Sequence, residues 1–147
     1  MDVEKYRNLF LKEAAEHIEN LDSALTKIEH GEVSPEIIHS IFRDVHSIKG
    51  MSASMGYHEI KFLSHKLENF LDLVRKNEIS FTDETIACFA DSVDFLENLI
   101  REVELEQIHF SNPISIIEQI EKIISANDQK KNKSASPGPE PSSITPN

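Results

Sequence analysis

The chain has 147 residues, and its 26 Asp and Glu against 15 Lys and Arg give a formal net charge of −11. This acidic balance disfavours electrostatic capture of nucleic acid or of an anionic membrane surface, so we expect neither as a partner. Cys88 is the only cysteine, which excludes an internal disulfide and a cysteine-built metal site. No apolar run approaches the ~20 residues that span a membrane, and we expect a soluble protein of the cytoplasm.

Most of the chain repeats apolar side chains every three or four positions, which is the spacing of amphipathic helices. The first predicted helix has an inward stripe that starts at Tyr6, and it ends at Gly31, where a left-handed cap is expected. A second helix begins at Ser34 and Pro35, because an N-cap serine followed by proline at the first helical position favours a helix start. Gly56 is expected to turn the chain into a third helix.

Two further helices complete the predicted fold. Thr82 is expected to cap the fourth helix, and Asn112 with Pro113 to start a shorter fifth helix over 114–125. No alternating strand pattern of useful length is present, so we expect an all-α fold, an antiparallel four-helix bundle with an additional fifth C-terminal helix. The isoleucines of the fifth helix are expected to pack on this bundle in a monomeric chain, with a contact to another chain as the alternative: Ile114, Ile117, Ile120, Ile123 and Ile124.

The C-terminal segment has a different composition from the rest of the chain. Four of the six prolines, and only two apolar residues, fall within residues 127–147. A segment of this kind cannot bury a core and is typical of a disordered linker. We therefore assign residues 1–126 to one folded domain, and we expect residues 127–147 to lead towards further domains that these 147 residues do not include.

Polar and charged residues that could carry chemistry gather on two helix stripes. At about 100° per residue, Val45 and Ile48 point inward and leave His46 about a quarter turn away, at the edge of the exposed face. The stripe of the second helix is His39, Arg43, His46, Lys49 and Gly50, and that of the third helix is Lys61, His65, Glu68 and Asp72. The short turn at Gly56 favours antiparallel neighbours, so the two stripes are expected to meet.

A meeting of these stripes has a chemical interpretation. A neutral imidazole is nucleophilic at the nitrogen that lacks a proton, and a carboxylate that accepts from the other nitrogen determines which one that is. Glu68 is expected to hold the proton on Nδ1 of His46 and to leave Nε2 towards solvent. Lys49, and more weakly Arg43, would neutralise charge on an arriving phosphoryl group. Gly50 would leave space for a partner to approach His46 closely.

Plainer interpretations stay open on the residues alone. The polar stripe is equally typical of a solvated face on a structural or partner-binding helical module, and Gly50 is equally typical of tight helix packing. A metal-binding bundle is a further alternative, because Glu36 and His39 match the Glu-x-x-His spacing of di-iron bundles once. That class requires two such motifs and two more inward carboxylates, and His39 is expected to face solvent.

Two segments of the chain carry a resemblance to a known family. "IFRDVHSIKGMSASMGYHEI" contains an H-x-x-K-G core with a second glycine six residues later, and "SHKLEN" follows, with His65 nineteen and Glu68 twenty-two positions after His46. This constellation resembles the histidine phosphotransfer (HPt) domain at the N-terminus of chemotaxis histidine kinases of the CheA type. The resemblance runs from the first helix to about residue 104, and we expect it to extend through the fifth helix to residue 126.

The resemblance implies a role for each matching residue. His46 would be the phosphoacceptor, on Nε2, and Glu68 would hydrogen-bond its Nδ1. Lys49 would assist phosphate transfer, His65 would belong to the surrounding polar network, and Gly50 would be the steric gap.

It also implies partners. A separate CheA-type kinase domain, acting in trans and using ATP and Mg²⁺, would phosphorylate His46, and an aspartate of a response-regulator receiver domain would then take the phosphoryl group. The chain itself would be a substrate and carrier, with no cofactor and no enzymatic turnover of its own. The alternative that keeps this chemistry is an HPt module of a multistep phosphorelay outside chemotaxis.

Overall fold

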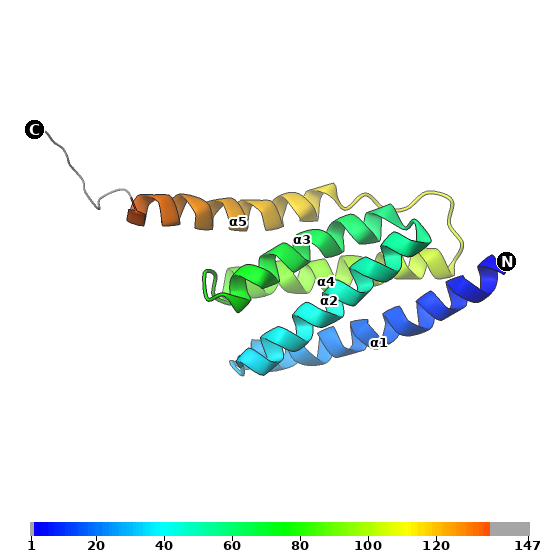
Figure 1. Ribbon diagram of the computed structural model, residues 1–147, viewed down its shortest axis with the longest axis horizontal. Helices are drawn as coiled ribbons and strands as arrows, with labels where there is room; N and C mark the ends of the chain where they lie inside the picture. The colour runs from blue at the N-terminus through cyan, green and yellow to red at the C-terminus, as the bar shows by residue number, and fades with distance from the viewer. Residues whose placement is uncertain (1, 136–147) are drawn as a thin grey trace, which may run out of the picture.

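The computed structural model describes residues 2–135, and within this part of the chain it contains five helices and no strand. The helices are α1 (Val3–Glu29), α2 (Pro35–Met55), α3 (His58–Arg75), α4 (Asp83–Glu104) and α5 (Ile114–Ala135). Helices α1 to α4 form a bundle of neighbours that run up and down, and α5 lies along the outside of α3 and α4 (Figure 1). The predicted all-α class, with four helices in a bundle and a fifth beside them, is confirmed.

Local sequence signals explain where the helices start. Ser34 Oγ accepts a hydrogen bond from the backbone N–H of Ile37 at 3.2 Å, so α2 has the predicted N-cap. Thr82 caps α4 through a reciprocal pair of hydrogen bonds with Thr85, in which each hydroxyl accepts from the other residue's backbone N–H. These caps satisfy backbone donors that a helix cannot satisfy internally.

Two glycines end the first two helices. Gly31 and Gly56 adopt positive φ angles of 85° and 76°, the left-handed region that residues with a Cβ enter at a cost. Gly56 allows α3 to begin two residues later, at His58, so α2 and α3 are brought together by a very short turn. These two helices share the most extensive contact in the bundle.

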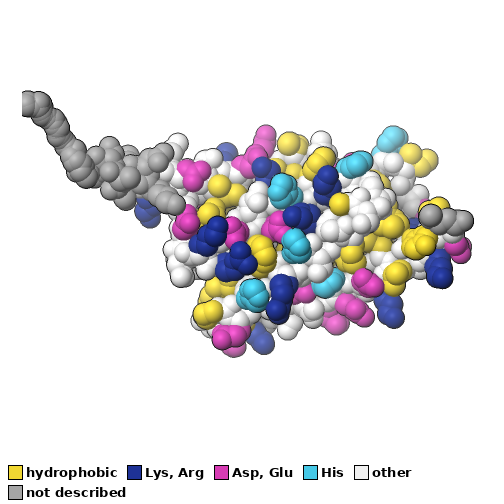
Figure 2. Space-filling model, in the orientation of Figure 1, with side chains coloured by type: hydrophobic (Ala, Val, Ile, Leu, Met, Phe, Trp, Pro, Cys, Tyr) yellow, Lys and Arg dark blue, Asp and Glu magenta, His cyan; other side chains and the backbone are white. Residues whose placement is uncertain are grey.

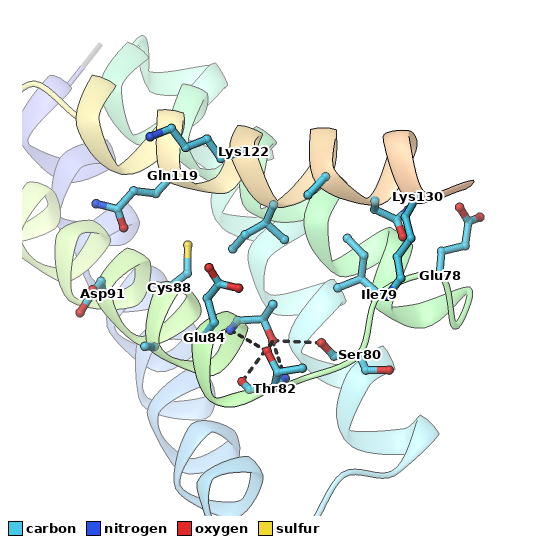
Figure 3. A pocket seen from close by; sticks show the side chains of 15 residues that line it. Glu78, Ile79, Ser80, Thr82, Glu84, Cys88, Asp91, Gln119, Lys122 and Lys130 are labelled. Carbon is cyan, nitrogen blue, oxygen red and sulfur yellow. Dashed lines mark hydrogen bonds between the residues drawn. The ribbon is translucent and has the colours of Figure 1, made fainter. Parts of the chain in front are cut away.

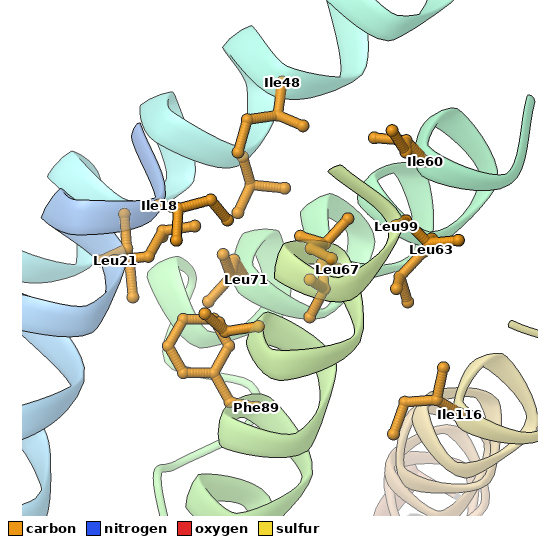
Figure 4. Packing of buried hydrophobic residues seen from close by; sticks show 14 of the residues in the cluster. Ile18, Leu21, Ile48, Ile60, Leu63, Leu67, Leu71, Phe89, Leu99 and Ile116 are labelled. Atoms are coloured by element: carbon orange, nitrogen blue, oxygen red, sulfur yellow. The ribbon is translucent and has the colours of Figure 1, made fainter. Parts of the chain in front are cut away.

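The core is an aliphatic and aromatic cluster to which all five helices contribute. In Figure 4, Leu67 and Leu71 of α3 lie among side chains of the other bundle helices, including Leu21 of α1 and Phe89 of α4. These four side chains are at most 1% exposed. Tyr6, predicted to begin the inward stripe of the first helix, is 47% exposed, because the packed stripe starts one turn later at Phe10.

Helix α5 joins this core through part of its length. Ile116, Ile117 and Ile120 are buried, whereas Ile114, which we expected to pack, is 53% exposed at the first position of the helix. Lys66 of α3 also pairs with Glu121 at 2.8 Å. The prediction that this helix packs on the bundle is therefore confirmed for its N-terminal half.

The C-terminal end of α5 differs from the predicted boundary. The helix continues to Ala135, nine residues past residue 126, where we placed the end of the folded domain. The rest of the predicted linker, residues 136–147, lies outside the described residues. Among the described helices, none combines the length and the apolar character needed to cross a membrane.

Candidate functional site

His46 and Glu68 meet where α2 and α3 pack together. The His46 side chain is 63% exposed, while Glu68 is only 12% exposed at the base of the same surface. Oε2 of Glu68 accepts a hydrogen bond from Nδ1 of His46. Nε2 has no hydrogen-bond partner among the described residues and stays accessible, and in the neutral imidazole an acceptor at Nδ1 favours the tautomer that carries its proton there. The predicted pair is therefore present in the structure.

Lys49 contacts the second oxygen of the same carboxylate. Its Nζ donates to Oε1 of Glu68 at 2.5 Å, so one carboxylate joins the histidine and the lysine of α2. Burial alone would raise the pKa of Glu68, but the hydrogen bonds and charges of Lys49 and His46 outweigh it and leave the pKa below its ordinary value. Glu68 is thus an anion at neutral pH and acts only as a hydrogen-bond acceptor.

Gly50 lies one turn after His46, on the exposed side of α2. A Cβ built at this position would meet no atom within 4 Å, and the backbone is ordinary helix. The glycine is therefore not required for close packing against another helix of this domain. This observation removes the packing interpretation and leaves open space beside His46 for another molecule.

Phe42 and Arg75 form a stacked arrangement on the other side of His46. The rings of Phe42 and His46 are nearly parallel, with an interplanar angle of 11° and centroids 6.2 Å apart. Cζ of Arg75 lies 4.1 Å from the centroid of the Phe42 ring, within the range of a cation–π contact. Arg75 also donates to Oδ1 of Asp72 at 2.5 Å, so the stack is anchored on α3.

The sequence analysis missed this stack. Phe42, which the sequence analysis did not place at the site, is half-buried and borders it. The signals that could have found the stack are the four-residue spacing of Phe42 and His46 and the three-residue spacing of Asp72 and Arg75, each of which places two side chains on one helix face.

A shallow hollow of about 360 Å³ opens beside the imidazole. Its lining comes from both helices and consists of Phe42, Arg43, His46, Glu68, Asn69 and Asp72. His65, which we expected in the polar network, is exposed on α3 and makes no hydrogen bond or ion pair within residues 2–135. The structure therefore brings together His46, Lys49 and Glu68, places Arg43 and Gly50 beside them, and leaves His65 at the edge.

A larger open groove of about 980 Å³ lies elsewhere, between α4, α5 and the segment that joins α3 to α4 (Figure 3). Cys88 borders it, and burial raises the pKa of this thiol, with a smaller contribution from nearby acids. The thiol is therefore protonated at neutral pH and is not activated as a nucleophile. The groove does not reach His46.

The geometry gives little support to the alternative of a metal-binding bundle. Glu36 and His39 are both exposed near the start of α2. Among the described residues, the structure has no group of three or more His, Cys, Asp or Glu side chains that could hold a metal ion.

The fold and the site together define a class: an all-α domain whose second and third helices present an exposed histidine held by a buried carboxylate. The family model described as the Hpt domain matches residues 5–107, and the chain belongs to that family. The match covers α1 to α4 and the start of the segment before α5.

The chain is similar to a part of much longer chemotaxis proteins. It is 33% identical over 103 residues to the chemotaxis protein CheA of Bacillus subtilis (strain 168). The matched segment covers 70% of this chain and 15% of that protein. It is also 33% identical over 97 residues to CheA of Listeria monocytogenes, covering 66% of this chain and 16% of that protein. The chain thus spans about a sixth of the length of these relatives.

Solved structures show the same fold. The solution structure of the histidine phosphotransfer domain of CheA has a TM-score of 0.71 and 30% identity, covering 80% of this chain and 90% of that one. The phosphorylated P1 domain of CheA3 in complex with CheY6 from R. sphaeroides has a TM-score of 0.77 at 19% identity, covering 83% of this chain and 97% of that one.

Proposed function

We propose that this chain is the phosphoacceptor and phosphotransfer domain of a CheA-type chemotaxis histidine kinase, with His46 as the phosphorylated residue. The observation that carries the proposal is the hydrogen bond from Nδ1 of His46 to Glu68, combined with an unoccupied Nε2 on an exposed ring. The similarity to CheA proteins of several bacteria supports the chemotaxis setting over a phosphorelay of another kind.

The first step is attack by Nε2 on the γ-phosphorus of ATP held by a separate kinase domain. A bond forms between Nε2 and phosphorus, the bond from phosphorus to the bridging oxygen breaks, and ADP leaves. The proton on Nδ1 stays there, and Glu68 stabilises the positive charge that develops on the ring. In this proposal ATP and Mg²⁺ belong to the kinase domain, which acts in trans, and this chain is a substrate and carrier.

The second step returns the imidazole to its starting form. A carboxylate oxygen of an aspartate on a receiver domain attacks the phosphorus, the bond to Nε2 breaks, and Nε2 recovers its lone pair. The solved complex of a phosphorylated P1 domain with CheY6 supports a receiver as the partner.

The neighbouring residues take supporting roles in this scheme. Lys49 holds Glu68 in its ionised form and supplies positive charge close to the phosphoryl group. Gly50 leaves room for the partner's active site beside His46. His65, exposed on α3, contributes to the polar surface that the partner covers and makes no direct contact with the imidazole.

Phosphosite mapping tests the proposal directly. The chain is incubated with ATP, Mg²⁺ and a CheA-type kinase domain, and we expect one phosphoryl group, labile in acid and stable in alkali, on His46. The label should be absent from His46→Gln and present in His39→Gln, a matched variant of an exposed histidine two turns earlier on α2. Label that persists in His46→Gln, or that appears on serine, would refute the assignment.

A further inference from the structure

Charge is distributed unevenly over this acidic protein. Helices α2 and α3 hold five Lys and Arg against five Asp and Glu, whereas the rest of the chain holds ten against 21. Four of the seven histidines are also on α2 and α3. Figure 2 shows histidine and Lys or Arg side chains gathered over the middle of this face. The helices that carry His46 therefore lack the acidic excess of the rest of the chain.

Each of the two carboxylates that line the hollow beside His46 has two partners among the described residues, whereas one cation of the lining has none. The Glu68 carboxylate accepts from Lys49 and His46, and Asp72 accepts from Arg75 at 2.5 Å and from Lys76 at 2.9 Å. Arg43 also lines the hollow, and within residues 2–135 its guanidinium makes no hydrogen bond or ion pair.

The guanidinium of Arg43 is well placed to bind a group on another protein. Arg43 lies three residues before His46, which puts it on the same face of α2 and about one turn away. Its side chain is exposed, so it can pair with an incoming group without breaking an internal contact. Lys49 differs, because its ammonium is already bound to Glu68.

We propose that Arg43 is a docking residue that pairs with a carboxylate at the rim of the receiver's phosphoaccepting site. This inference rests on the proposed function. A site that accepts a phosphoryl group on an aspartate with the help of a divalent cation is rich in carboxylates, because oxygen ligands hold such a cation. An acidic rim of this kind complements the guanidinium of Arg43 beside His46 and is repelled by the acidic remainder of the protein.

Transfer kinetics test the pairing. The domain is phosphorylated on His46, and its transfer rate to a receiver is measured over a range of receiver concentrations at low and high salt. We expect Arg43→Glu to raise the KM for the receiver by about tenfold at low salt, with kcat within about twofold and a smaller KM effect at high salt. Arg43→Lys should recover most of the affinity. Arg101→Glu, an exposed control on α4, should leave KM within about twofold of the parent.

The outcomes separate this inference from the proposed function. A KM for Arg43→Glu equal to that of Arg101→Glu overturns the inference while His46 phosphorylation stands. A fall in kcat with unchanged KM also overturns it, because the guanidinium would then act on the phosphoryl group. A defect confined to phosphorylation by the kinase domain overturns it as well. Absence of any phosphorylation on His46 is a failure of the proposed function itself.

Discussion

Glu68 of α3 accepts a hydrogen bond from Nδ1 of His46 of α2, across 22 positions of sequence. The carboxylate is largely buried and the imidazole is largely exposed, so the buried partner orients the exposed one. The same carboxylate holds Lys49 through its other oxygen. One side chain on α3 thus binds both His46 and Lys49 of α2.

Replacing Glu68 by alanine should change the chemistry of His46 more than the stability of the fold. The substitution removes the acceptor that keeps the proton on Nδ1, so both tautomers should become populated and phosphotransfer should slow by about ten- to a hundredfold. Nitrogen chemical shifts of the imidazole report the tautomer, and circular dichroism reports the fold. Glu118→Ala on α5 is the exposed control. An unchanged tautomer and rate in Glu68→Ala would make Glu68 a bystander.

The stability contributed by Glu68 should depend on pH in a defined direction. Its pKa in the folded protein lies below the ordinary value of 4.5, because the hydrogen bonds and charges of Lys49 and His46 outweigh the effect of burial. The contribution is therefore fully present above about pH 4.5 and is lost as the pH falls through the lowered pKa. Urea unfolding of the parent and of Glu68→Gln at several pH values measures this. The difference between the two unfolding free energies should shrink as the pH falls, and a difference that grows would contradict the prediction.

Two substitutions at Gly50 should affect different properties, one the stability of the fold and the other the rate of phosphorylation. Gly50→Ala places a Cβ in open space within a helix, so the unfolding free energy should rise by about 0.5–1 kcal/mol. Gly50→Leu should also leave the fold intact, but its side chain should obstruct a partner and lower the rate of phosphorylation by the kinase domain. Thermal unfolding and initial rates check the pair. A destabilised Gly50→Ala, or a Gly50→Leu that reacts like the parent, would exclude this role of the glycine.

Helix α5 offers a matched pair that tests its packing. Ile120 is 1% exposed and Ile114 is 53% exposed, although both belong to the same helix. Ile120→Ala should lower the unfolding free energy by about 2–4 kcal/mol, because it empties a packed position. Ile114→Ala should change it by less than about 0.5 kcal/mol. Equal effects of the two substitutions in chemical denaturation would mean that α5 does not pack as the structure shows.

Much of the fold could be predicted from the sequence because its signals are local. Ser34 before Pro35, Thr82 before an acidic turn, and the two glycines with positive φ each act within a few residues of a helix end. The three- and four-residue spacing of apolar side chains then predicts which face each helix buries. The same spacing places His46 at the edge of an exposed face.

The end of α5 shows where composition is a weaker guide than helix propensity. Residues 127–134 are polar, and we assigned residues 127–147 to a linker because a segment of this composition cannot bury a core. Polar residues such as Gln129 and Lys130 are nevertheless good helix formers, and no proline occurs between Pro113 and Pro137. A helix that has already started can therefore continue to Ala135 through a polar segment.

The helix starts, their caps and the exposed position of His46 could be predicted because they depend on residues close together in the chain, and the short turn at Gly56 predicts that the stripes of α2 and α3 meet. Tertiary packing was needed to show that Lys49 binds Glu68, that Gly50 faces open space, that Arg75 stacks on Phe42 and that Arg43 has no partner among the described residues. These facts depend on the distance between side chains of different helices, and helical periodicity sets only the direction in which a side chain points.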